Sequence, residues 1–307
     1  MSAVAAVLMV VAAAGITGAR IFKNTQAGVA VAALVGTMPL LLRHADLYAV
    51  LPLIAGLAWL ATMEAFERTG RAAWLVSATA VLGLATGLGA TALITMPLLF
   101  AATMIVYLTI DGARPLRPSA LLLSLITFAA GMVPTIVFLA ANPAWYRSRI
   151  RAYGWYDAER FNVLQGAREM FSRLGIAERS AAYWRYIDPS FLFLPGPTLA
   201  DAIPSPVVFL TPLMLLLPLG MTHALASKQR VQILVVLAFL LAPVAGALVA
   251  RPPASVRILI AAPFAGILAY GGLLYLRERG RGGAIAAAVL AAAVAGQALL
   301  YLAALTS

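Results

Sequence analysis

The chain has 307 residues, of which 63% are hydrophobic and only 11% charged, with no cysteine and a mean hydropathy of +0.95. Soluble globular domains carry about 25% charged residues, so this composition excludes that class of protein. The lack of cysteine also excludes disulfide frameworks, thiol nucleophiles and thiolate metal sites. The net charge of +11 sits in short basic clusters between apolar runs, a pattern that favours the orienting loops of a membrane protein over nucleic-acid binding.

Ten apolar segments follow one another along the chain, each close to the about 20 residues that cross a bilayer as a helix. They cover residues 2–19, 27–42, 47–63, 73–88, 91–109, 119–141, 206–223, 231–250, 257–275 and 284–304. We therefore expect an all-α, polytopic transmembrane protein with about ten spans. The fourth and fifth segments form one run interrupted only by Gly83, Gly87 and Gly89, so a single kinked helix is the alternative there. These glycines favour close helix packing, because the Lys-Ser/Thr of a phosphate-binding loop is missing.

A polar segment, 142–204, separates the sixth and seventh spans. It holds twelve of the chain's 27 aromatic residues and eight arginines, and disordered segments are poor in aromatics, so we expect a small folded subdomain. Apolar residues at helical spacing predict an amphipathic helix from Asp157, its N-cap, to Gly175, its end. A second short helix is expected over 177–187, before Asp188-Pro189. The domains are therefore 1–141, 142–204 and 205–307.

Basic residues in alternate connections predict the orientation. One set of connections holds eleven: Arg20, Lys23, Arg68, Arg71, Arg114, Arg117, Lys228, Arg230, Arg277, Arg279 and Arg281. The short connections of the other set hold three, Arg43, Arg251 and Arg257. The positive-inside rule makes the first set cytoplasmic, which places both termini and 142–204 on the external face. His44 and His223 then fall on opposite faces, about 30 Å apart, and cannot share a metal site.

Two interpretations of 142–204 remain open. In the first, its helices lie flat on the outer leaflet, with aromatic side chains at headgroup depth and arginines on lipid phosphates. In the second, its aromatic faces and arginines form a pocket for a lipid phosphate that carries a sugar. Trp184 and Tyr186 are the aromatic candidates for such a pocket. The two interpretations are compatible, because an enzyme with a lipid substrate must sit at that interface.

Four stretches together resemble one family. Residues 186–196, Tyr-Ile-Asp-Pro-Ser-Phe-Leu-Phe-Leu-Pro-Gly, resemble the SPDFLFxxGD stretch of the GT-C membrane glycosyltransferases of the dolichyl-phosphate-mannose protein mannosyltransferase type. Residues 27–48, which contain Pro39 and, near their end, Arg43-His-Ala-Asp46, agree in order, as do 74–97 and 253–257. The resemblance implies transfer of a sugar from a polyprenyl-phosphate donor at the non-cytoplasmic face. It also implies that this sequence starts at the family's second helix, so the catalytic carboxylate of the family's first loop has no counterpart here.

The resemblance also suggests roles for residues at the external face. Asp46 matches an acidic position of the family; beside His44 it is the candidate to orient a hydroxyl or to share a metal with a ligand, and an N-cap of the third span is its alternative role. Arg257, with Arg251, is the candidate to bind the donor phosphate; the alternative is that it reaches up to lipid headgroups. Asp188 matches the aspartate of the loop motif and is the candidate ligand or turn residue.

We expect, from these residues, a GT-C-like glycosyltransferase, or a split or truncated copy of one, in a bacterial cytoplasmic membrane. The alternative is a catalytically silent descendant that serves as a structural or lipid-binding subunit of a larger membrane complex. The expected partners are membrane lipids, a polyprenyl-phosphate sugar and another membrane protein chain. We assign no cofactor and no metal ligand. A transporter is the third option, and it is disfavoured because no predicted span carries a buried acidic residue near mid-membrane, where coupling ions would bind.

Overall fold

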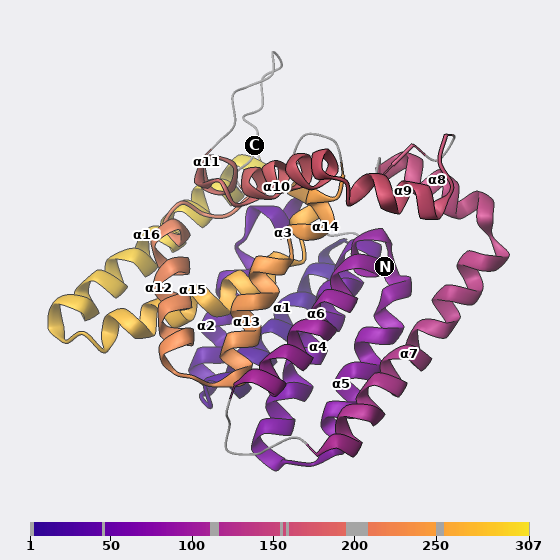
Figure 1. Ribbon diagram of the computed structural model, residues 1–307. Helices are drawn as coiled ribbons and strands as arrows, with labels where there is room; N and C mark the ends of the chain where they lie inside the picture. The colour runs from indigo at the N-terminus through magenta and orange to yellow at the C-terminus, as the bar shows by residue number, and fades with distance from the viewer. Residues whose placement is uncertain are drawn as a thin grey trace.

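The computed structural model describes residues 3–44, 47–110, 117–153, 156–157, 160–194, 208–249 and 255–306. Within these ranges the chain is helical and forms no strand (Figure 1). The all-α prediction is therefore confirmed for the part of the chain that is described.

Each of the ten predicted apolar segments contains a helix. The first seven helices are α1 Ala3–Ile21, α2 Thr25–Gly36, α3 Pro39–His44, α4 Leu47–Thr69, α5 Ala72–Ala85, α6 Ala90–Thr109 and α7 Pro118–Ala141. The polar segment contributes α8 Pro143–Tyr153, α9 Val163–Met170, α10 Arg173–Ile187 and α11 Pro189–Phe193. The last five are α12 Leu213–Ala226, α13 Arg230–Leu241, α14 Val244–Ala247, α15 Ala261–Arg277 and α16 Arg281–Thr306.

Six helical stretches among the described residues are long and apolar enough to cross a membrane. They are Val4–Ile21, Ala49–Thr69, Ala90–Thr109, Pro118–Ala141, Arg230–Ala247 and Arg281–Ala303. Shorter apolar helices cover Thr25–Gly36, Ala72–Leu88 and Leu213–Ala226. These lengths and compositions indicate a multi-pass integral membrane protein.

The apolar run between Trp74 and Ile110 forms two helices, not one kinked helix. A 3-10 turn, Thr86–Leu88, follows α5, and Gly89 then takes a φ of 152°, which separates it from α6. Gly83 packs closely on α7, because a Cβ there would come within 2.4 Å of the carbonyl oxygen of Phe128. Close packing by small residues, the predicted role of these glycines, therefore holds for Gly83.

Helix α15 forms the centre of the bundle. Every residue from Ala261 to Gly272 is buried, and α12, α2, α13 and α16 all pack against it. At the periphery, α7 and α16 expose many large apolar side chains, among them Leu122, Leu125, Ile136, Ile285, Val289 and Leu300. Apolar helix faces exposed in this way suit contact with lipid tails.

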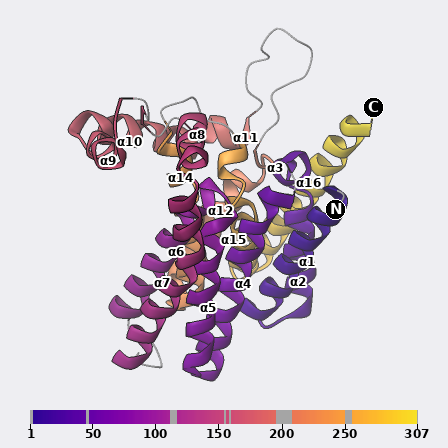
Figure 2. The same ribbon diagram turned by 90° about the vertical axis from the view of Figure 1, so that its right-hand side faces the viewer.

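The helices of the polar segment run across one end of the bundle (Figures 1 and 2). The predicted helix from Asp157 to Gly175 is wrong in its limits. Helix α9 starts later, at Val163, because the side chains of Asn162 and Gln165 form a capping box, and it ends at Met170, because Ser172 caps the next helix, α10. Gly175 therefore lies inside α10. The second predicted end is correct: α10 stops at Ile187, before Asp188.

Candidate functional site

The end of the bundle that carries α10 and α11 also carries α3, α14 and the 3-10 turn Ser255–Ile258 (Figure 2). His44 on α3 and Ser255 on that turn are joined by a hydrogen bond of 3.0 Å between Nε2 and Oγ, although 211 positions separate them in the sequence. The structure thus brings together two stretches that the family resemblance had linked only by their order. We refer to His44, Ser255 and Arg257 as the His44 cluster.

Arg257 lies on the same turn as Ser255. Its side chain is half-buried, as is that of His44. A guanidinium in this position combines a strong donor for phosphate oxygens with partial protection from water, and the His44 imidazole and the Ser255 hydroxyl add hydrogen-bonding groups at the same end of the bundle. The His44 cluster therefore has the chemistry to hold an oxygen-rich anionic group at the end of the bundle.

The two aromatic candidates have different surroundings. Tyr186 is 1% exposed, its ring meets that of Phe191 edge to face at 5.5 Å, and a Cβ on Gly246 of α14 would lie 2.8 Å from its Cζ. Its neighbour Tyr183 donates a hydrogen bond of 2.9 Å to the carbonyl of Leu240. These residues fix α10 to the bundle, and the Tyr186 ring is not open to a ligand in this structure. Trp184, by contrast, is 67% exposed.

Asp188 acts as the N-cap of α11. Its Oδ1 accepts hydrogen bonds from the Ser190 hydroxyl at 2.6 Å and from the Ser190 backbone N–H at 2.8 Å. These two bonds hold the pKa of the Asp188 carboxyl below its ordinary value, although the group is exposed. Of the two roles expected for Asp188, the turn role is the one that its contacts support.

Replacing Asp188 by alanine is expected to loosen the first turn of α11, whereas Asp188→Asn should preserve it, because asparagine is also a good N-cap. In the wild type the cap should persist at neutral pH and weaken as the pH falls below the ordinary aspartate range and through the lowered pKa. Hydrogen exchange of α11 measures both effects. Equal protection in the wild type and in Asp188→Ala would contradict the assignment.

The remaining candidates of this end, Asp46 and Arg251, lie outside the described residues. The His44 cluster is therefore defined without them.

A second site lies at the opposite end of the bundle, and the sequence did not predict it. The predicted third span stopped at residue 63, but α4 continues to Thr69. Glu64 is 9% exposed, so a buried carboxylate lies within this apolar helix, close to the end of α4 and not near its middle. The signal was present in Glu64-Ala-Phe-Glu67, where two acids at helical spacing continue an apolar run.

A cavity of about 300 Å³ opens beside Glu64. Its lining comes from the end of α4 and from the α1–α2 and α12–α13 turns: Ile21, Lys23, Glu64, Glu67, Arg68, Lys228, Gln229, Arg230 and Val231. Arg230 is 5% exposed; its Nη2 and Nε donate to the carbonyl of Ile110 at 2.8 and 3.0 Å, and its Nη1 lies 3.6 Å from Glu67 Oε1.

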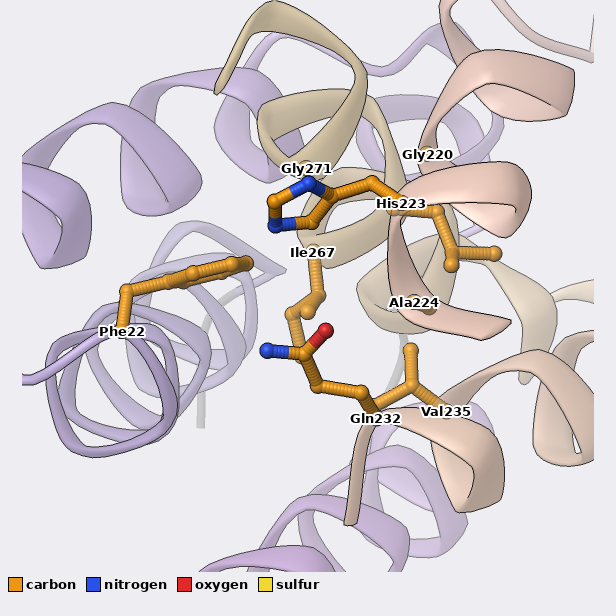
Figure 3. A pocket seen from close by; sticks show the side chains of 9 residues that line it. Phe22, Gly220, His223, Ala224, Gln232, Val235, Ile267 and Gly271 are labelled. Carbon is orange, nitrogen blue, oxygen red and sulfur yellow. The ribbon is translucent and has the colours of Figure 1, made fainter. Parts of the chain in front are cut away.

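A smaller pocket lies next to this cavity. Figure 3 shows the imidazole of His223, the amide of Gln232 and the ring of Phe22 facing a common space, whose volume of about 10 Å³ holds one water at most. Gln232 connects the two pockets, because its Nε2 donates to Gln229 Oε1 at 3.3 Å. His223 also lies 3.7 Å from Glu278. This pocket is too small for a substrate.

The described residues contain no group of three or more His, Asp or Glu side chains suited to a metal ion. The two clusters that remain are the His44 cluster at one end and the Glu64 cavity at the other. No protein-family model, no curated protein and no solved structure matches this chain.

Proposed function

We propose that this chain is a GT-C-like membrane protein that binds a polyprenyl-phosphate-linked sugar at the end of the bundle that carries α8 to α11. The observation that carries the proposal is the His44–Ser255 hydrogen bond. It joins two of the four stretches that resemble the family, and a third stretch, 186–196, contains the last two residues of α10 and the whole of α11, which lie at the same end. In this proposal Arg257 binds the phosphate, and His44 and Ser255 bind sugar or phosphate oxygens.

Exposed apolar side chains support a membrane-surface position for this end. Leu164, Phe171, Leu174 and Trp184 are each at least 67% exposed, and they alternate with arginines along α9 and α10. Amphipathic helices of this composition lie at headgroup depth. A lipid-linked donor would reach the His44 cluster from that level without leaving the membrane.

The second candidate function is lipid binding without catalysis, as a subunit of a larger membrane complex. One contact favours it: the Asp188 carboxylate is engaged in capping α11, so it is not poised to deprotonate an acceptor. Glycosyl transfer needs such a base, which contributes about 10² to 10⁴-fold to the rate. The first function requires donor binding at the His44 cluster, whereas a structural or lipid-binding subunit requires neither the sugar donor nor turnover.

Donor binding is tested with Arg257→Gln, measured by native mass spectrometry of the purified protein with a polyprenyl-phosphate sugar. Loss of a charge-assisted hydrogen bond should weaken binding about 10-fold to 100-fold, and Arg168→Gln, which removes an exposed arginine of α9, should not. Equal affinity of both variants would reject the phosphate role of Arg257. Turnover by the wild type, lost in Asp46→Asn, would favour the enzyme and make Asp46 the base. Donor binding without turnover would support a split enzyme, and the lack of both would favour the silent subunit.

The proposed topology has about ten spans, with α8 to α11 and both chain ends external. It follows from the basic residues of the connections, and the start of α1 and the end of α16 both lie toward the end that carries α8 to α11 (Figure 2). Because the chain lacks cysteine, Ser180→Cys on α10 and Ala72→Cys at the start of α5 test it by labelling intact cells. An impermeant thiol reagent should label position 180 only. Labelling of position 72 alone would reverse the orientation.

A further inference from the structure

We propose that the Glu64 cavity is a binding site for a phosphate group that carries a hydrogen-bond donor on a short arm, the chemistry of a glycerol-phosphate or ethanolamine-phosphate headgroup. This site is distinct from the His44 cluster, lies at the opposite end of the bundle, and does not depend on the proposed glycosyltransferase function. Its volume of about 300 Å³ falls at the lower end of the range of small-molecule sites.

At the floor of the cavity, one carboxylate oxygen of Glu64 accepts no hydrogen bond. Glu64 is 9% exposed and its Oε2 has no hydrogen-bond partner. A buried carboxylate oxygen left in this state is costly, so the site is completed by a ligand that brings a hydroxyl or ammonium group to that oxygen. This requirement defines the donor arm of the ligand.

One wall of the cavity is fixed by its own contacts. The Arg230 guanidinium is held by the Ile110 carbonyl and by Glu67, and it lies 4.7 Å from the centre of the Tyr107 ring. Because the protein already holds this arginine in place, a ligand need not order it, which reduces the cost of binding.

The mouth of the cavity is basic. Lys23, Lys228 and Arg68 are exposed and line it together. Lys23 and Lys228 are the only lysines in the sequence, and they are also the described non-glycine residues with positive φ, 52° and 54°. Each follows the end of a helix, where glycine is the favoured residue for this conformation. Both turns thus direct a lysine toward the same cavity.

The charge of the cavity lining favours an anionic ligand. The lining holds four basic residues, Lys23, Arg68, Lys228 and Arg230, against two acids, Glu64 and Glu67, which leaves a formal charge of +2. A phosphate at the mouth meets the three exposed cations, while its donor arm reaches Glu64 below them. A simple cation would satisfy Glu64 but would be repelled at the mouth.

The two lysines allow a direct test. The purified full-length protein is treated with an acetylating reagent in large excess over every amine present, with and without glycerophosphoglycerol or glycerophosphoethanolamine, and modification of Lys23 and Lys228 is read by mass spectrometry. Both ligands should protect both lysines. Dimethyl phosphate, which has no donor arm, should protect them only at concentrations about 10-fold higher or more. Lack of protection by every phosphate would reject the site.

Three variants test which residues bind the donor arm of the ligand and which bind its phosphate. Glu64→Gln should lower the affinity for the donor-bearing ligands about 10-fold and leave dimethyl phosphate unchanged, whereas the control Glu178→Gln, an exposed acid of α10, should change neither. Lys23→Gly and Lys228→Gly should each weaken all phosphates by up to about fivefold. Glycine accepts positive φ without steric cost, so these variants should be at least as heat-stable as the wild type. Equal loss of both ligand classes in Glu64→Gln would overturn the donor contact.

The source of the phosphate is decided by the same protection measured in lipid nanodiscs. Protection of Lys23 and Lys228 in phosphatidylglycerol or phosphatidylethanolamine discs, compared with phosphatidylcholine discs, would identify a lipid headgroup, since choline has no donor. Protection only by the soluble esters would identify a soluble phosphate ester. Stronger protection by phosphatidylcholine than by either donor-bearing lipid would contradict the proposal.

Discussion

Arg230→Met is expected to be among the most destabilising single substitutions in this protein, at about 3–5 kcal/mol of unfolding free energy. The arginine is 5% exposed. It gives the Ile110 carbonyl two donors and lies 3.6 Å from Glu67. Methionine has a similar volume but leaves that carbonyl without these donors and the half-buried Glu67 carboxylate without its counter-charge. Denaturant unfolding of the purified protein in detergent measures the loss.

The double variant Arg230→Met/Glu67→Met is the control for this prediction. It removes both charges and should recover part of the stability, because the half-buried Glu67 carboxylate is no longer left without its counter-charge. Arg68→Met, which removes an exposed arginine one residue further along α4, should cost little. If Arg230→Met lowered the free energy of unfolding by less than about 1 kcal/mol, the Arg230–Glu67 ion pair would be as weak as an exposed surface pair, and the prediction would be wrong.

Gly220→Ala is expected to disrupt the packing of α12 against α15. A Cβ at this position would lie 1.9 Å from the carbonyl oxygen of Leu268 and 2.6 Å from its carbonyl carbon. These are backbone atoms of the central helix α15, so no side-chain rotation can relieve the clash and the two helices must separate. We expect a loss of about 3 kcal/mol or more, the upper end of the cost of overpacking.

The matched control is Gly296→Ala on α16. A Cβ there meets no atom within 4 Å, and alanine is a better helix residue than glycine by about 0.5–1 kcal/mol, so stability should stay the same or rise. The midpoint of thermal unfolding in detergent compares the two variants. If the Gly220→Ala protein were as stable as the Gly296→Ala protein, a Cβ would fit between α12 and α15, and the prediction would be wrong.

The sequence by itself determined the class of protein and the positions of its apolar helices. Length and hydropathy of a segment are local properties, and a helix in a membrane satisfies its backbone hydrogen bonds within itself. The ends of several helices, among them α6 and α7, could therefore be predicted from neighbouring glycines, prolines and charges. Others differ: Asn162 caps α9 in place of Asp157, α4 runs on through Glu64, and the predicted spans 27–42 and 231–250 each form two helices.

Only the tertiary structure decided which residues meet and which are buried. His44 and Ser255 contact each other across 211 positions, and no local pattern specifies such a pairing. Tyr186 and Trp184 are two residues apart on one helix, yet one is 1% and the other 67% exposed, because α14 covers only one face of α10. The same holds for Lys23 and Lys228: each looks like an ordinary loop lysine in the sequence, and the packing of α1, α4 and α13 makes them neighbours of a buried carboxylate.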